Sequence, residues 1–140
     1  MALPCVVEYT GMGGGRGLPH EHPLWVGAGF AHVVVDMRGQ GEWRRGDTPD
    51  GPYAPAAGPS AYVTRGLPDP DSYYYTRLIV DAVRAVGATS GLAGVDAGRI
   101  AVIGTSQGGG VSLAVAGLTQ VAAVVADVPF LCHFIRGMEI

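Results

Sequence analysis

The sequence of 140 residues contains no lysine, so all nine of its basic side chains are arginines. Without a lysine the chain cannot form the Gly-Lys-Ser/Thr end of a P-loop, which excludes nucleotide binding of that kind. The formal net charge is −3, and the arginines form no basic cluster. A surface that follows a nucleic-acid backbone is therefore not expected.

The chain is also poor in cysteine and in long apolar runs. Its two cysteines, Cys5 and Cys132, each lie beside an apolar stretch, which is typical of free thiols in a reducing compartment. The longest apolar tract, 111–128, is interrupted by polar residues, so no membrane span is expected. The N-terminus lacks the charged and apolar regions of a signal peptide, which favours a cytoplasmic location.

Four short stretches rich in valine and isoleucine show no alternation of polar and apolar residues, as is typical of strands buried on both faces. They cover residues 5–9, 32–36, 99–103 and 121–127. Helices are expected at about 22–26, from an Asp-Pro-Asp start at 69–71 through 86, and at about 107–118. This order predicts an α/β fold with a parallel sheet of about four strands flanked by helices.

Residues 41–68 and the two ends depart from this regular order. The segment 41–68 is rich in glycine and proline, and Tyr53, Tyr62 and Arg65 favour a packed loop that covers the site. The chain enters a buried strand at once, and its apolar tail at 130–135 shows no closing helix. The sequence therefore predicts a partial α/β domain over residues 1–140, truncated at both ends, with open sheet edges.

The most informative segment is Gly104-Thr105-Ser106-Gln107-Gly108, between an expected strand and an expected helix. This is the G-x-S-x-G pattern of a nucleophilic serine in its strand-turn-helix context. A serine hydroxyl becomes a good nucleophile on a strained turn, beside a base and near N–H groups that bind the oxyanion. Gly104 and Gly108 would let strand and helix approach closely. The plain alternative is a glycine-rich turn with an incidental serine.

The other members of a catalytic triad are harder to find. In hydrolases of this type the chain order is serine, then acid, then histidine. The histidine that follows Ser106 is His133, which comes too soon after the last strand to return over the serine. Asp127 is the in-chain candidate for the acid, and its alternative is a turn or helix-cap aspartate before Pro129.

Two further motifs could bind ligands. The glycine-rich run at 13–17 does not fit a dinucleotide-binding G-x-G-x-x-G motif, because Arg16 stands where a glycine is needed. His20-Glu21-His22 could be a metal pair, but no third ligand follows at a useful spacing. We therefore expect a solvated loop there, and neither a metal nor another cofactor.

Several segments together resemble the acetyl xylan esterase/cephalosporin-C deacetylase family of α/β-hydrolases. They are residues 8–17, 36–41, 64–66, 71–77, 104–109 and 126–130. The likeness covers nearly the whole chain, and Arg-Gly-Gln followed by Gly-x-Ser-Gln-Gly is more specific than G-x-S-x-G alone. The resemblance implies a cytoplasmic enzyme, often a ring-shaped homo-oligomer, that deacetylates short acyl esters on sugars or on the cephalosporin nucleus. A small acylated molecule is its expected partner.

The resemblance also implies roles for single residues. Ser106 would be the nucleophile, and the backbone N–H groups of Met12 and Gln107 would bind the oxyanion. The family usually has tyrosine at the position of Met12, so the acyl pocket differs here. Arg38-Gly39-Gln40 would brace the site, and the triad Asp and His would lie beyond residue 140.

Some simpler roles and other functions remain open. Arg38 could be an ion-pair partner of Asp36 or Asp71, and the tyrosines at 73–75 could be a helix face packed on the sheet. The main functional prediction is a serine carboxylic-ester hydrolase. The alternatives are a catalytically inactive fragment of such an enzyme, or a peptidase or thioesterase on the same scaffold.

Overall fold

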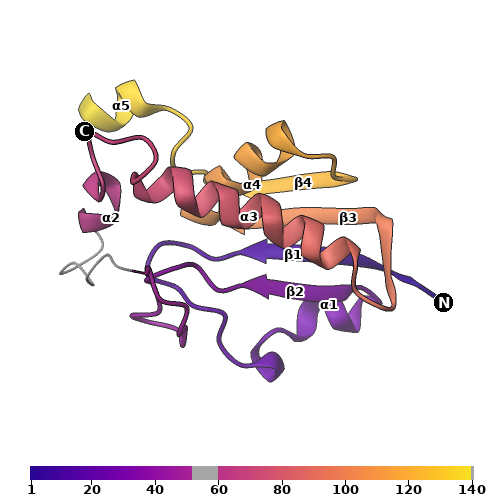
Figure 1. Ribbon diagram of the computed structural model, residues 1–140. Coiled ribbons are helices and arrows are strands. Elements are labelled where there is room, and N and C mark those ends of the chain that lie inside the picture. Colours follow the sequence, from indigo (N-terminus) through magenta and orange to yellow (C-terminus); the bar gives the residue numbers. More distant parts are fainter. Residues whose placement is uncertain (52–59, 140) are drawn as a thin grey trace.

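Four parallel strands form the centre of the molecule in the computed structural model (Figure 1). The structure describes residues 1–51 and 60–139. The strands are β1 (Leu3–Tyr9), β2 (Ala31–Val35), β3 (Val95–Thr105) and β4 (Ala123–Asp127). Their order across the sheet is β2-β1-β3-β4, and each neighbouring pair is parallel. All four expected strands therefore occur, with shifted ends.

Within residues 1–51 and 60–139, six helical segments accompany the sheet. They are η1 (Pro19–Glu21), α1 (Pro23–Gly27), α2 (Ser60–Thr64), α3 (Tyr74–Ser90), α4 (Gln107–Leu118) and α5 (Phe134–Glu139). α4 has the predicted bounds, and α1 lies within one residue of them. None of the described helices is both long and apolar enough to cross a membrane.

The two larger helices pack together on one face of the sheet, and α1 packs against β2 (Figure 1). Side chains of a β-strand alternate between faces, so Cys5, Val7 and Tyr9 share one face and Glu8 points to the other. Cys5, Val7 and Tyr9 form one core cluster with buried residues of α3 and α4. The chain passes from β1 to β2 on one side and then crosses back to β3 on the other side of β1. The direction of winding therefore reverses between β1 and β3, and a doubly wound sheet binds its ligands at such a point.

α3 begins later than the sequence indicated. The Asp-Pro-Asp stretch was expected to start this helix, but the Asp69 carboxylate accepts hydrogen bonds from the Asp71 N–H (3.1 Å) and the Ser72 hydroxyl. These bonds close a turn before the helix, because a short acidic side chain can satisfy nearby backbone groups in place of a helix. Tyr73 is the N-cap residue.

The apolar tail also differs from the prediction, since it ends in α5 rather than without a helix. His133 precedes α5, and its Nδ1 accepts the N–H of Arg136 at 3.1 Å. This bond caps the first turn with a histidine, which is not one of the usual N-cap residues. The sequence therefore carried no start signal for this helix. Phe134 and Ile135 of α5 are each 65% exposed.

The long glycine- and proline-rich segment is packed where the structure describes it. Tyr62 is 2% exposed, and its hydroxyl donates to the Gly39 carbonyl at 2.7 Å. The Arg65 guanidinium lies 4.6 Å from the Tyr62 ring. The expectation of a packed loop is confirmed for these residues, and α2 inside it was not expected. Tyr53 lies outside the described residues.

Candidate active site

Ser106 forms the turn between β3 and α4, and its backbone is strained. Its φ of 57° and ψ of −118° lie where residues other than glycine are rarely found. The Ser106 N–H donates to the Asp127 carbonyl at 3.0 Å. The Ser106 carbonyl accepts from the N–H groups of Gly110 (3.1 Å) and Phe130 (2.9 Å). A strained serine between strand and helix is the geometry of a nucleophile elbow, as the sequence predicted.

The two glycines of the motif are required by close backbone contacts. A Cβ atom on Gly104 would lie 2.2 Å from the carbonyl carbon of Gly108. A Cβ atom on Gly108 would lie 1.9 Å from the carbonyl oxygen of Tyr9, at the end of β1. No side chain fits at these distances, so the expected close approach is confirmed. It involves β1 as well as β3 and α4.

A cavity of about 500 Å³ opens at the carboxyl ends of β1 and β3. Ser106 lines it, together with Met12 from the loop after β1. The other lining residues are Glu8, Tyr9, Thr10, Gly11, Trp25, Trp43, Arg44, Ile103, Gly104, Thr105, Val125 and Asp127. β1 and β3 are neighbours in register, with Glu8 opposite Ile103. The prediction that these strand ends meet beside Ser106 is therefore confirmed.

The backbone N–H groups of both candidate oxyanion donors have no acceptor among the described residues. Met12 lies beside Ser106 in the cavity, and Gln107 is the first residue of α4. Within the described part of the chain, neither N–H donates to a protein acceptor. For Gln107 this follows from its place in the first turn of a helix, where N–H groups have no intrahelical partner. The oxyanion role of these two groups stays a prediction.

Gln40 connects the glycine loop to the start of α4. Its Oε1 accepts the N–H of Gly13 at 2.7 Å. Its Nε2 donates to the Tyr74 hydroxyl (2.6 Å) and to Gln107 Oε1 (3.0 Å). Gln40 is 5% exposed and Gln107 is fully buried, so these bonds form away from water, where they hold their partners firmly. Gln40 thus ties together the two segments that carry Met12 and Gln107.

The tyrosines at the start of α3 pack in the core with strand residues, as predicted for a helix face on the sheet, and their hydroxyls also belong to the same network. The Tyr75 hydroxyl donates to Gln107 Oε1 at 3.2 Å, and the Tyr74 hydroxyl donates to the Arg38 carbonyl at 2.7 Å. Burial raises the pKa of both phenols above the ordinary value. Both hydroxyls therefore stay protonated and can donate at any physiological pH.

The sequence suggested Asp36 or Asp71 as ion-pair partners of Arg38, but Arg38 pairs with neither. Its guanidinium binds Asp81 of α3 through two hydrogen bonds, of 2.5 and 2.8 Å, and lies 3.5 Å from Asp50. The Asp36 carboxylate is occupied by other donors, among them the Thr48 hydroxyl at 2.8 Å. Arg38 therefore fastens the segment after β2 to α3.

Gly39 and Arg38 support the site from outside the cavity. Gly39 has a φ of 67°, and a Cβ atom there would lie 2.9 Å from the Asp50 Cβ. Neither residue lines the Ser106 cavity. Of the Arg38-Gly39-Gln40 element, Gln40 alone makes hydrogen bonds to the segments on either side of Ser106.

Asp127 lines the cavity at the end of β4, whereas His133 does not. His133 lies in a separate apolar pocket with Val63 and Phe134. No histidine in the described ranges lines the cavity beside Ser106. Asp127 is not a helix N-cap either, because α5 begins only at Phe134.

Sequence reasoning missed the aromatic and charged wall of the cavity, formed by Trp25, Trp43 and Arg44. The Trp43 indole N–H donates to the Met12 carbonyl at 2.8 Å. Its ring lies over the glycine loop, where a Cβ on Gly13 or Gly14 would come within 2.9 Å of it. The glycine-rich sequence of the loop was itself a signal for such a wall, because a loop with so few side chains must be covered by side chains from another segment.

The glycine loop itself does not present a phosphate cradle. The N–H of Gly13 is used by Gln40, and the N–H of Gly14 donates to the Gly11 carbonyl at 3.0 Å. The N–H of Arg16 donates to Asp36 at 3.2 Å. These three N–H groups are hydrogen-bonded within the protein and are not available to a phosphate, which agrees with the mismatch to the dinucleotide-binding motif.

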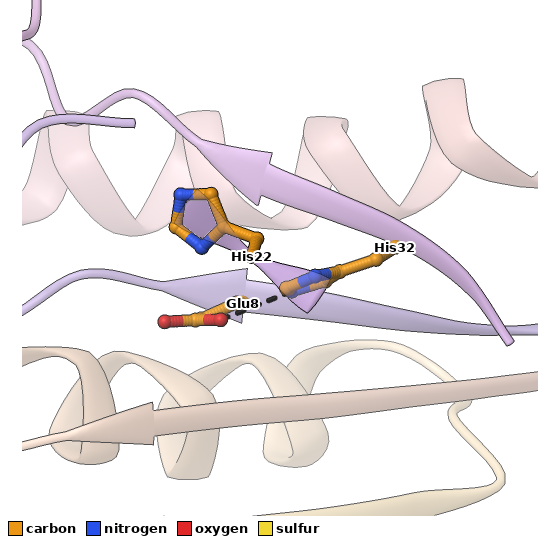
Figure 2. Close-up of side chains that lie close together, drawn as sticks. All are labelled: Glu8, His22 and His32. Atoms are coloured by element: carbon orange, nitrogen blue, oxygen red, sulfur yellow. Dashed lines mark hydrogen bonds and ion pairs between the residues drawn. The ribbon is translucent and has the colours of Figure 1, made fainter. Parts of the chain in front are cut away.

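His22, the last residue of the His-Glu-His motif, has partners that the motif did not suggest. It lies beside Glu8 of β1 and His32 of β2 (Figure 2). His20 is exposed, and the Glu21 carboxylate accepts the Leu18 N–H at 2.9 Å. His20 and His22 are therefore neighbours in sequence but do not form a pair in space. The tertiary structure places His22 beside Glu8 and His32 instead.

The fold and the elbow together define an α/β hydrolase with a serine at the nucleophile position, beside a cavity at the switch point of the sheet. The sequence profile of the acetyl xylan esterase (AXE1) family matches residues 1–140. The chain belongs to this family, as the resemblance predicted.

Individual relatives agree with this assignment. The acetyl esterase Axe7A of Xylanibacter ruminicola is 42% identical over 73 residues, which are 51% of this chain and 17% of that protein. The solved acetyl xylan esterase of Paenibacillus sp. R4 is 44% identical, with a TM-score of 0.87 over 99% of this chain. Acetyl xylan esterase 1 of Thermoanaerobacterium sp. JW/SL YS485 is 31% identical, with a TM-score of 0.83 over 99%. The chain spans 43% of each of these two solved chains.

Proposed function

We propose that this protein is a serine carboxylic-ester hydrolase that removes acetyl groups from acetylated sugars, with Ser106 as the nucleophile. The observation that carries the proposal is the strained Ser106 turn, which opens into the same cavity as Met12. Two solved members of the family are named acetyl xylan esterases, and this supports an acetylated sugar as substrate.

In the proposed reaction the Ser106 Oγ attacks the carbonyl carbon of the acetyl group and its proton passes to a base. The carbonyl oxygen becomes an oxyanion, which the N–H groups of Met12 and Gln107 stabilise. Each such donor contributes on the order of 100-fold or more to the rate of related hydrolases. The sugar alcohol then leaves, and water releases acetate from the acyl-serine.

The proposed base is a histidine outside residues 1–140, since no histidine in the described ranges reaches the Ser106 cavity. The triad acid is likewise proposed to lie outside, and Asp127 is the in-chain alternative. A serine without its base retains only the weak catalysis that binding and oxyanion donors provide. Residues 1–140 alone are therefore expected to be nearly inactive.

Cephalosporin-C-type esters are a second proposed substrate, because Arg44 puts a positive charge in the wall of the cavity. A cephalosporin carries a carboxylate that this guanidinium could bind, whereas an acetylated xylose unit has none. Assembly into a homo-oligomer and a cytoplasmic location are also proposed, on the family resemblance alone.

The proposal is tested by hydrolysis of acetylated xylan oligosaccharides with the full-length protein and its Ser106→Ala variant. The variant should lose nearly all turnover and keep its circular dichroism spectrum, because only a hydroxyl at a turn is removed. Ser90→Ala, at the exposed end of α3, is the matched control and should keep wild-type turnover. Wild-type turnover by Ser106→Ala would exclude Ser106 as the nucleophile.

Substrate preference is tested separately with Arg44→Gln. If cephalosporin C is a substrate, the KM for cephalosporin C should rise in this variant, and the KM for the acetylated sugar should stay unchanged. Butyryl and longer acyl esters of the same alcohol would distinguish a deacetylase from a thioesterase-like or lipase-like enzyme.

A further inference from the structure

Glu8, His22 and His32 bring one carboxylate and two imidazoles together, from three different segments (Figure 2). Glu8 lies on β1, His32 on neighbouring β2, and His22 between η1 and α1. One donor atom from each residue lies within 4.8 Å of the other two. These three residues are called the Glu-His-His cluster below. His22 comes from a loop and His32 from a strand, so no local sequence pattern predicts that the two histidines meet.

We propose that the Glu-His-His cluster is a binding site for a divalent transition-metal cation, with zinc as the best match. Two histidines and a glutamate are a donor set that zinc uses in proteins, with water completing the coordination. Glu8 Oε2 and His32 Nε2 lie 3.0 Å apart. Two donors on the same zinc ion lie about 3.3 Å apart, so this pair already has nearly the spacing the metal needs.

The third donor is set by a hydrogen bond to the backbone. His22 Nε2 lies 2.7 Å from the carbonyl oxygen of Arg16. A carbonyl can only accept, so Nε2 carries a proton, and Nδ1 is the nitrogen that can coordinate a cation. Metal-binding histidines are usually held in this way, with the other ring nitrogen donating to a carbonyl or carboxylate. The bond therefore selects the tautomer in which His22 can coordinate a cation.

His32 turns its Nε2 toward Glu8 and contributes this nitrogen to the cluster. Its side chain is 4% exposed, and its Nδ1 has no hydrogen-bond partner within the described residues. Nδ1 is the ring nitrogen that does not face Glu8, so Nε2 is the nitrogen of His32 that would coordinate the cation. The His22 and His32 rings also meet edge to face at 5.5 Å, so the two imidazoles of the cluster are in direct contact.

The surroundings leave room and charge for that cation. His22 and His32 line a cavity of about 270 Å³, which Arg16 also lines. The Arg16 guanidinium would repel a metal, but it is bound to Asp36 and Asp47. Glu8 lines the neighbouring Ser106 cavity, so the cluster borders both cavities. A bound metal would join β1 and β2 to the segment that runs from the glycine loop to α1.

The test is zinc titration of the full-length protein by isothermal calorimetry, with Glu8→Gln, His22→Gln and His32→Gln variants. The wild type should bind one zinc ion per chain at this site, and each variant should bind it on the order of 100-fold more weakly. His22→Gln is decisive because it changes a half-exposed loop residue and leaves the sheet intact.

Two control variants separate this site from adventitious zinc. His20→Gln removes the exposed histidine next to the motif, and His133→Gln removes one that lies beside the exposed Cys132. Both should bind zinc as the wild type does, and so should Ser106→Ala, because the cluster does not depend on the proposed esterase reaction. Equal affinity in His22→Gln and His20→Gln, or no binding to the wild type, would overturn the proposal.

Cobalt provides a spectroscopic check. Co²⁺ held by two imidazoles and a carboxylate in a low-symmetry site gives a visible d–d absorption that aqueous Co²⁺ lacks. This band should appear with the wild type and be absent with His22→Gln. Zinc should also raise the melting temperature of the wild type, since a ligand that binds the folded state stabilises it, and should not raise that of the variant.

Discussion

The turns that follow β1 and β3 border the same cavity, yet they are held in different ways. The turn at Ser106 is fixed by backbone packed against backbone: Gly108 lies so close to the Tyr9 carbonyl that no side chain fits. The glycine loop after β1 is fixed by side chains that reach it from the segment after β2, chiefly Gln40 and Trp43. A backbone contact tolerates almost no change, whereas side-chain support can be altered one bond at a time.

This difference separates the two halves of the proposed oxyanion site. The Gln107 N–H belongs to the rigid turn, and its position follows from the packing of β1, β3 and α4. The Met12 N–H belongs to the loop, and its position depends on residues that are distant in sequence. Changes in the segment after β2 can therefore reshape the cavity without moving the proposed nucleophile.

The largest expected effect comes from Gly108→Ala. The new Cβ would lie 1.9 Å from the Tyr9 carbonyl oxygen, so β1 and α4 must separate. We expect a loss of roughly 3 kcal/mol or more in unfolding free energy, measured by urea denaturation. Gly117→Ala is the control, because Gly117 is on the same helix and a Cβ atom there would meet no other described part of the protein within 4 Å. It should be neutral or stabilising by about 0.5–1 kcal/mol. Equal effects would show that the turn is not fixed by backbone contact.

A smaller effect, confined to the loop support, is expected for Asp50→Asn. The Asp50 side chain is 2% exposed and binds Arg65 (2.8 Å) and Arg77. The amide keeps one acceptor oxygen but removes the negative charge from these cations, which should cost about 1.5–3 kcal/mol. Asp96→Asn, which removes an exposed pair with Arg99, should cost less than about 1 kcal/mol.

Asp50 also makes this support sensitive to acid. Burial by itself would raise the pKa of its carboxyl, but the hydrogen bonds and charges of Arg77 and Arg65 outweigh it and hold the pKa below the ordinary value. A lowered folded-state pKa stabilises the protein above the unfolded value of about 3.9, and this contribution is lost as the pH falls through the folded-state pKa. Melting curves below about pH 4 should therefore fall more steeply for the wild type than for Asp50→Asn. Parallel curves would contradict this role.

The smallest stability effect is expected for Gln40→Leu, which removes the hydrogen bonds that tie the loop to Tyr74 and Gln107. The Gly13 N–H would lose its acceptor in a buried place, at a cost of about 1–3 kcal/mol. Because the loop carries Met12, kcat for the acetyl ester should fall by about 10–100-fold with little change in KM. The exposed Gln120→Leu is the control and should change neither quantity. A KM effect alone would show that Gln40 acts on substrate binding rather than on the loop.

The pattern of apolar runs and glycines predicted the parallel sheet and α4 well, because these depend on local periodicity and on burial of both sheet faces. It placed the start of α3 too early, since Asp69 satisfies its own turn, and it missed α5, whose cap is a histidine. It assigned Arg38 the wrong partners, because a long side chain chooses among several acids that only packing brings within reach.

The sequence by itself determined the elbow: five consecutive residues carry both the serine and the glycines that its strained turn requires. Only the tertiary structure decided what surrounds that turn, since Trp43 and Gln40 meet the glycine loop from a segment after another strand. The same holds for the Glu-His-His cluster, in which His22 leaves its sequence neighbours and meets Glu8 and His32. A motif within one turn is set by local backbone geometry, whereas a site assembled across strands depends on sheet order and on register.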